Sequence, residues 1–247
     1  MAPGKPTMHS RRLRSATLLS EPSAVRRRGP VKALRTAVAG QRAVAASGTR
    51  RPTREERVAL VRLKIFDAAA AVVGEFGYAD TTISRIVERA DIAQGTFYLY
   101  FASRQALFDQ LLPHFGQQLI AYVRGEVSGA TSFLEVEERG FVATIDFLRE
   151  HRGFYRVLNE AEMAAPIAHR KHMKVLTEHY VSSMKRDVAQ GRITPLRKAE
   201  LEVMAHVFEG ARTYLYMRYL KDAPPGKKLP EWVVRTYMTL VRSGLQA

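Results

Sequence analysis

The stretch QGTFYLYF, residues 94–101, sets small and polar side chains directly ahead of four aromatic ones. Gln94 and Thr96 carry hydrogen-bonding groups that can meet the edges of nucleobases. Gly95 has no side chain, so a ligand such as DNA can approach the backbone closely there. The aromatic residues could instead only fill the core of a small domain, but core packing does not require Gly95 and Thr96 ahead of them. The order of residue types therefore favours a surface that contacts nucleic acid.

Two helices are expected ahead of this stretch. Thr53 and Glu56 have the spacing of a capping box, and apolar residues then recur every three or four positions up to Gly77, where glycine can end a helix. A second, shorter helix follows Thr81 or Thr82 and has apolar residues at i, i+3, i+4 and i+7. A helix this short needs neighbours to pack against, so we expect both helices to pack with the aromatic stretch.

A tight turn connects the second helix to a third, at about residues 93–100. Asp91 tolerates the left-handed backbone of such a turn, and Ile92 can close the core from within it. Phe97 and Phe101 are four positions apart, so both rings face inward on a helix and anchor it. Three helices in this order are the outline of a helix-turn-helix module, in which the start of the third helix reads DNA.

The segment TTISRIVERADIAQGTFYLYFASRQALF resembles the DNA-binding domain of the TetR (tetracycline-repressor) family of bacterial transcription regulators, and the likeness covers residues 55–112. It departs from the family pattern at Asp91, Ala93 and Arg104, and the first two leave the start of the third helix less well capped. The resemblance implies contacts to both phosphates and bases. We expect phosphate contacts from Thr82, Tyr98, Tyr100 and Arg104, base contacts from Ser84, Gln94, Thr96 and Leu99, and close backbone approach at Gly95.

The net charge of +15 is concentrated near the N-terminus. Residues 1–54 hold thirteen basic residues against a single acidic one. We expect residues 1–52 to be a disordered basic arm, because they contain no aromatic residue and few large apolar ones to bury. The arm could neutralise DNA phosphates, be an organelle transit peptide, or be an extension without function. We assign DNA contacts to Arg50, Arg51 and Arg54, which lie nearest the fold.

Helical periodicity continues beyond residue 104 and no strand alternation is visible, so the predicted fold class is all-α. We expect a helix-turn-helix domain at residues 53–103, joined to a larger helical domain at 104–247. In the TetR family this second domain binds an effector and forms a homodimer. Candidate pocket residues, each of which could instead be plain core, are Phe141, Phe147, Phe154, Tyr155, Tyr180, Met184 and Arg212. This set suits a small hydrophobic effector such as a fatty acyl compound, an aromatic or a drug.

Other functional classes are disfavoured. Cysteine is absent, which removes disulfides, thiol catalysis and thiolate metal sites. The histidines are scattered, and neither a nucleophile–base spacing nor a glycine-rich phosphate loop occurs, so we expect no enzyme and no cofactor. His169 and His172 stand among Arg and Lys, which predicts a solvated basic face and no metal site. No apolar run reaches the roughly 18 residues of a membrane helix, which favours a cytoplasmic protein without a membrane partner.

These features predict a ligand-responsive transcriptional regulator. We expect a homodimeric repressor that binds a palindromic operator in double-stranded DNA and is released by its effector. Effector binding would tilt the helix that begins near residue 104, with Pro113 as a kink point. The alternative is a non-specific basic protein that compacts DNA through its charged arm.

Overall fold

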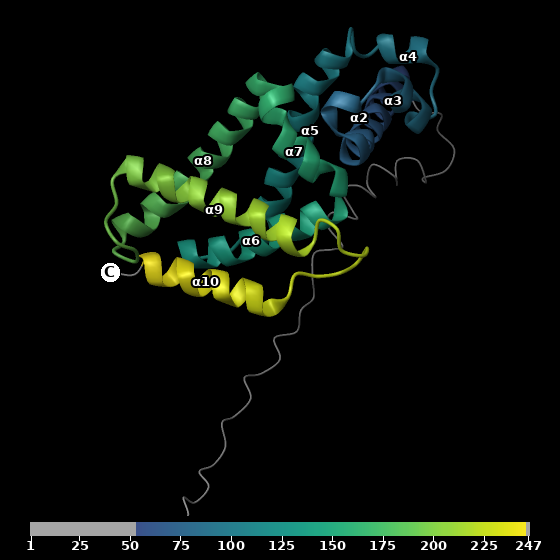
Figure 1. The fold of residues 1–247 in the computed structure, drawn as a ribbon. Helices are drawn as coiled ribbons and strands as arrows, with labels where there is room; N and C mark the ends of the chain where they lie inside the picture. The colour runs from purple at the N-terminus through teal and green to yellow at the C-terminus, as the bar shows by residue number, and fades with distance from the viewer. Residues whose placement is uncertain (1–52, 246–247) are drawn as a thin grey trace, which may run out of the picture. The chain divides into compact units, whose positions relative to one another are not determined.

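The computed structural model describes residues 53–245, and all of them belong to one compact unit. Within this part of the chain every regular element is a helix, which confirms the all-α class (Figure 1). The helices are α2 (Arg54–Asp80), α3 (Ile83–Ala90), α4 (Gln94–Tyr98), α5 (Arg104–Glu126), α6 (Phe133–Glu150), α7 (Arg152–Ala164), α8 (Pro166–Ala189), α9 (Lys198–Tyr219) and α10 (Glu231–Leu245). The expected basic arm, with Arg50 and Arg51, lies outside the described residues. A domain boundary after residue 103 stays a prediction.

The first helix, α2, precedes the helix-turn-helix and begins at the expected capping box. The Thr53 N–H donates to Glu56 Oε2 at 2.7 Å, and the Glu56 N–H donates to Thr53 Oγ1 at 3.1 Å. Gly77 has a φ of +82° and breaks the helical geometry, as its sequence position predicted. The helix resumes for a short turn to Asp80, beyond which the Thr81 hydroxyl donates back to Gly77 O at 2.6 Å.

The next two helices form the expected tight turn. Thr82 caps α3, because its Oγ1 accepts from the Arg85 N–H at 3.2 Å. Asp91 ends α3 with a φ of 52°, the left-handed conformation that the turn requires. α4 covers only Gln94–Tyr98 and is shorter than expected. Ala93 provides no side-chain cap for α4, as predicted, because a methyl group cannot accept a hydrogen bond from the backbone.

The long helix α5 leads away from this module. Ser103 caps it by accepting from the Ala106 N–H at 3.1 Å. The helix runs through Pro113 to Glu126 as one element. A single helix therefore connects the helix-turn-helix to the remaining helices.

α2 and α7 are in direct backbone contact. A Cβ atom at Gly153 of α7 would lie only 2.2 Å from Ala70 O of α2, and one at Gly74 would lie 2.5 Å from the Gly153 Cα. Such distances leave no room for any side chain at either glycine. The helix that precedes the helix-turn-helix is therefore packed tightly onto a helix that follows α5 and α6.

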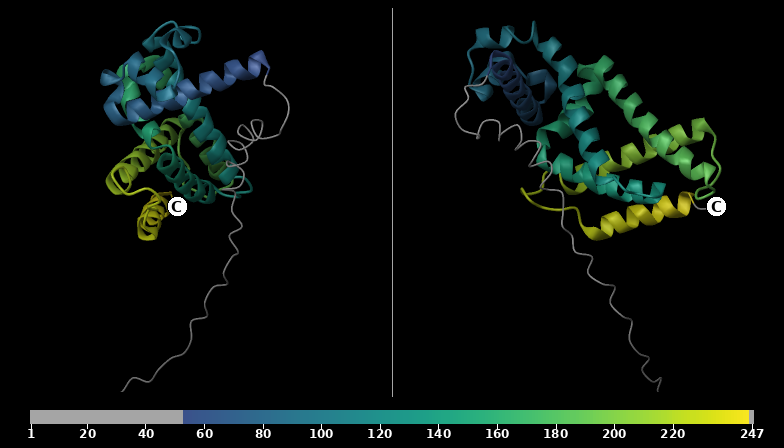
Figure 2. Two further views of the ribbon diagram at one scale, coloured as in Figure 1. Left: turned by 90° about the vertical axis from the view of Figure 1, so that its right-hand side faces the viewer. Right: turned by 180° about the vertical axis from the view of Figure 1, so that it is seen from behind.

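The remaining helices extend away from the helix-turn-helix (Figures 1 and 2). α10 packs against α6, and in all views it lies at the opposite end of the described residues from α4 (Figures 1 and 2). Within residues 53–245, no helix has the length and apolar character needed to cross a bilayer.

Candidate DNA-binding surface and effector cavity

The start of α4 lies at the surface, whereas its aromatic anchors are buried. Gln94 and Gly95 are exposed and Thr96 is half-buried. Phe97 and Phe101 are 0% and 2% exposed, with ring centroids 5.7 Å apart. A recognition helix needs this combination of a rigid base and free hydrogen-bonding groups at its leading end.

The residues that follow provide a second set of surface groups. Leu99 is 82% exposed and Tyr98 is 51% exposed. The Tyr98 ring meets Phe97 edge-on with centroids 5.5 Å apart, so the phenol is braced by the core of the module. Tyr100 is half-buried and packs against that core. Leu99 therefore presents an apolar side chain at this surface, beside the Tyr98 phenol.

The predicted contact residues outside α4 are also accessible. Thr82 and Ser84 are exposed at the start of α3, and Arg54 is exposed at the start of α2. The Thr82 hydroxyl uses its oxygen as the acceptor of the capping bond, so its proton remains free to be donated to a phosphate oxygen.

Arg104 has a structural connection that the sequence did not indicate. Its Nη1 donates to Thr81 O at 2.9 Å and to Ala79 O at 3.3 Å, and its guanidinium lies 5.5 Å from the Phe108 ring centroid. The side chain is nevertheless exposed. Arg104 thus ties the start of α5 to the segment before α3 while it presents a positive charge at the surface.

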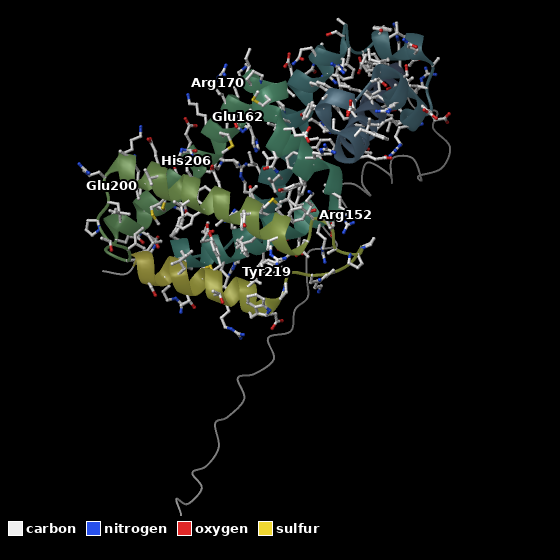
Figure 3. The ribbon with its side chains drawn as sticks, in the orientation of Figure 1. Arg152, Glu162, Arg170, Glu200, His206 and Tyr219 are labelled. Carbon is white, nitrogen blue, oxygen red and sulfur yellow. The ribbon has the colours of Figure 1, made fainter. Side chains whose placement is uncertain are left out.

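A cavity of about 970 Å³ lies among α5, α6, α7, α8 and α9. Figure 3 labels Glu162 of α7 and His206 of α9, which both line it. Much of its wall is apolar, with side chains that include Leu119, Ile120, Val123, Leu158, Met173, Leu176 and Met217. Three of the expected pocket residues are also part of the wall: Tyr155, Tyr180 and Arg212.

The structure places the other four expected pocket residues in the solid core. Phe141, Phe147, Phe154 and Met184 are at most 1% exposed and are not part of the cavity wall. Phe141 stacks on Tyr237 at 4.4 Å, and Phe147 meets Phe154 edge-on at 5.7 Å. Apolar periodicity marks a buried face, but it cannot separate a face packed against other rings from one that borders a void.

Arg212 takes part in a buried polar network at the cavity wall. Its Nη2 donates to Glu137 Oε2 at 2.8 Å, and its Nη1 donates to Thr144 Oγ1 at 3.1 Å. The Tyr237 hydroxyl donates to Glu137 Oε1 at 2.5 Å. Burial and the neighbouring Glu137 raise the pKa of Tyr237, so this phenol keeps its proton. The charge of the fully buried Glu137 is therefore balanced inside the protein by Arg212.

Glu137 was not among the pocket residues predicted from the sequence. It stands four positions after Phe133 and four before Phe141, both of which are buried on the same helix. A charged residue at an inward position of an apolar stripe is the signal that could have found it, because a buried charge requires a partner.

α7 borders both the cavity and the DNA-binding part. Tyr155 and Leu158 line the cavity. Arg156 and Glu160 form an ion pair, and Arg156 Nη1 also donates to Glu75 O in α2 at 3.1 Å. One helix therefore connects a wall of the cavity to the end of α2.

In the segment HRKHMK, Arg170, Lys171 and Lys174 are exposed, as expected for a solvated basic face, but His172 is buried. His172 is 6% exposed, and its ring packs onto α5 at Gly116, where a Cβ atom would lie 2.5 Å from His172 Nδ1. Burial, with a smaller effect of His169, lowers the pKa of His172 to about 4, so the ring is neutral at pH 7. His169 lines the cavity. The charged neighbours were visible in the sequence, but the packing of this face against α5 was not.

The family model of the tetR family of bacterial regulatory proteins matches residues 65–111, which run from α2 into α5 and include the whole α3–α4 unit. The chain belongs to the TetR family of transcriptional regulators. This TetR-family protein is 24% identical to the transcriptional repressor KstR2 of Mycobacterium tuberculosis over 192 residues, which cover 74% of this chain and 92% of KstR2. It is 38% identical to the uncharacterized regulator YvdT of Bacillus subtilis over 73 residues, 30% of this chain and 38% of YvdT.

Solved structures show the same fold. KstR2 of M. tuberculosis superimposes with a TM-score of 0.58 at 21% identity, covering 75% of this chain and 95% of KstR2. The regulator FadR of B. subtilis, solved in complex with stearoyl-CoA, gives a TM-score of 0.63 at 19% identity and covers 74% of this chain and 98% of FadR. The relatives are transcriptional regulators, and the α3–α4 unit of this TetR-family chain is its DNA-binding helix-turn-helix.

Proposed function

We propose that this TetR-family protein is a repressor that binds a palindromic operator as a homodimer and is released by a small, largely apolar effector. The observation that carries the DNA-binding part is the exposure of Gln94 and Gly95 on α4 above the buried rings of Phe97 and Phe101. Two copies related by a two-fold axis would place two such helices about 34–36 Å apart in successive major grooves. The operator would repeat the same symmetry.

Within each protomer the contacts divide into two kinds. Base edges would be read by Ser84 at the start of α3, by Gln94 and Thr96 on α4, and by Leu99 directly after α4. Phosphates would be bound by Thr82, Tyr98, Tyr100 and Arg104 and by the arginines at positions 50, 51 and 54. A glutamine side chain suits an adenine edge, because its amide both donates and accepts.

The cavity supports the proposal of a largely apolar effector. Its volume of about 970 Å³ is within the range of pockets that hold drug-sized ligands, about 300–1,000 Å³. FadR of B. subtilis is seen with stearoyl-CoA, and KstR2 is named a ketosteroid transcriptional regulator. A fatty acyl, polycyclic or drug-like skeleton would suit the aliphatic wall of this cavity as well.

The connection from the cavity to DNA would pass through α5 and α7. α7 lines the cavity and is bonded to the end of α2. α5 also lines the cavity, and its first residue, Arg104, is bonded to the segment before α3. A ligand that fits one tilt of these helices better than another would change the spacing of the two recognition helices.

The homodimer would form through α9. Val203, Val207 and Tyr214 are 61%, 53% and 62% exposed and recur at i, i+4 and i+11, which places them on one face. Contiguous exposed apolar surface of this kind marks an interaction site. Val207→Glu should convert a dimer to a monomer in sedimentation velocity and weaken operator binding, whereas a wild-type protein that sediments as a monomer would exclude the dimer.

Selection from a random duplex library tests the DNA-binding proposal. We expect enrichment of a two-fold symmetric site, bound by two protomers, that survives excess random DNA. The alternative, a non-specific DNA-compacting protein, predicts no enriched sequence and complete loss of binding to excess random duplex. The full chain should be used, because the basic N-terminal region contributes to either outcome.

A further inference from the structure

Four polar groups at the wall of the cavity lack hydrogen-bond partners. They are Tyr180 Oη, Ser183 Oγ, Glu209 Oε1 and Arg212 Nε, and each is buried with no partner among the described residues. All four residues line the cavity. A buried polar atom without a partner is unfavourable, so four of them in one region indicate hydrogen-bonding groups that a ligand could satisfy.

The four groups come from two neighbouring helices. Tyr180 and Ser183 are i, i+3 on α8, and Glu209 and Arg212 are i, i+3 on α9. The two helices pack against each other, and the Arg212 guanidinium lies 5.1 Å from the Tyr180 ring centroid. The unpartnered groups therefore form one polar patch, defined by these four residues, in a cavity whose wall is otherwise largely apolar.

The positive charge of Arg212 in this patch is already paired with a carboxylate. Arg212 is bonded to the buried Glu137 at 2.8 Å, and Glu137 also accepts from Tyr237. Glu209 provides a second carboxyl group beside Arg212; its Oε2 lies 3.4 Å from His206 Nδ1, and burial raises its pKa. A ligand carboxylate placed here would face two carboxyl groups with one guanidinium, in a region shielded from water.

The unpartnered groups also define the hydrogen-bonding character of the ligand. Tyr180, Ser183 and Arg212 can each donate, whereas only Glu209 must accept. A ligand atom that accepts hydrogen bonds thus satisfies more of the patch than an ammonium group, which can only donate.

We infer that the cavity binds a ligand whose buried end carries an uncharged oxygen, a carbonyl or a hydroxyl, that accepts hydrogen bonds from Tyr180 and its neighbours in the polar patch. This inference rests on the proposed role of the cavity as the effector site. The four atoms are closed to solvent in this structure, so binding requires the side chains of α8 and α9 to turn toward the ligand.

Three naphthalene derivatives of similar shape test the inference by equilibrium dialysis against the full chain. They are 2-acetylnaphthalene, 2-ethylnaphthalene, which lacks the oxygen, and 2-naphthoate, which is charged at pH 7.5. We expect the ketone to bind at least about tenfold more tightly than either of the others, because only the ketone satisfies the patch without adding charge. Equal affinities for all three would overturn the inference and leave the apolar effector cavity intact. Failure of all three to bind, and to change the melting temperature, would count against the cavity as an effector site.

Two variants, Tyr180→Phe and Ser183→Ala, identify which hydroxyl donates the hydrogen bond to the ketone oxygen. Each removes an unpartnered hydroxyl, so the fold should be kept. Tyr180→Phe should lower the affinity for the ketone to that for 2-ethylnaphthalene, and Ser183→Ala should lower it less. Tyr219→Phe is the matched control, because Tyr219 lies at the end of α9 against Trp232, with centroids 5.6 Å apart, and is not part of the cavity wall (Figure 3). An unchanged preference for the ketone in Tyr180→Phe would overturn the role of this hydroxyl.

Discussion

The backbone N–H of Tyr78 donates to Glu160 Oε2 at 2.9 Å, across 82 positions of sequence. The bond joins the last turn of α2 to α7, next to the break at Gly77. Glu160 also forms an ion pair with Arg156, whose Nη1 donates to Glu75 O at 3.1 Å. A helix that lines the cavity and the first helix of the DNA-binding module are therefore linked by hydrogen bonds as well as by packing.

Glu160→Ala should destabilise the protein by about 1–3 kcal/mol, because it leaves the part-buried Tyr78 N–H and the Arg156 Nε–H without their acceptor. Glu160→Gln keeps an acceptor oxygen and should therefore lower the free energy of unfolding by less. Urea unfolding measures both. Glu138→Ala, which removes an exposed carboxylate from α6, is the control and should change stability by less than about 0.5 kcal/mol. If Glu160→Ala matched this control, the link would have no energetic role.

Gly153→Ala should weaken the contact between α2 and α7. The new Cβ would lie 2.2 Å from Ala70 O, and backbone atoms on both sides cannot give way without separating the helices. We expect the free energy of unfolding to fall by about 1–3 kcal/mol, which would be measured as a lower melting temperature. Gly125→Ala, in α5 with no atom within 4 Å of the new Cβ, should instead be neutral or stabilise by up to about 1 kcal/mol. Equal melting temperatures for the two variants would contradict the close crossing.

Gln94→Ala and Arg104→Ala should change DNA binding in different ways. Gln94 is exposed, so its loss should leave stability unchanged and relax the preference at one base pair by about 1–3 kcal/mol. Arg104→Ala should weaken binding to all sequences and reduce the slope of log affinity against log salt by about one. It should also lower stability slightly, because Ala79 O and Thr81 O lose a donor. Fluorescence anisotropy on the selected operator and on point variants of it, at several salt concentrations, separates the two effects.

Stability should fall as the pH is lowered below about 6.5. Burial lowers the pKa of His172 from 6.5 to about 4, so the unfolded chain binds a proton in this range that the folded protein does not. The stabilisation is fully present above pH 6.5 and is lost as the pH falls toward 4. Between pH 7 and pH 5 the loss from this residue is about 2 kcal/mol.

His172→Asn isolates that contribution, because burial also lowers the pKa values of His114 and His151, which act in the same direction. Urea unfolding at pH 7 and pH 5 should therefore give a smaller pH dependence for the variant than for wild type. An identical dependence in both proteins would mean that His172 is solvated.

The sequence by itself determined the features that depend on local interactions. The capping box of Thr53 and Glu56, the left-handed turn at Asp91 and the inward spacing of Phe97 and Phe101 each involve residues within four positions of one another. Local backbone geometry fixes these contacts wherever the segment lies in the fold. The helix-turn-helix and the placement of Gln94 at its surface could be predicted for this reason.

Tertiary structure alone decided which buried side chains meet. Phe154 and Tyr155 are neighbours in sequence, yet Phe154 is packed in the core and Tyr155 lines the cavity, because the packing of α7 between other helices sets which face borders the void. Arg212 and Glu137 are 75 positions apart, and their pairing depends on how α9 lies against α6. Periodicity gives the buried face of one helix, but the partner of that face follows only when every helix is packed together.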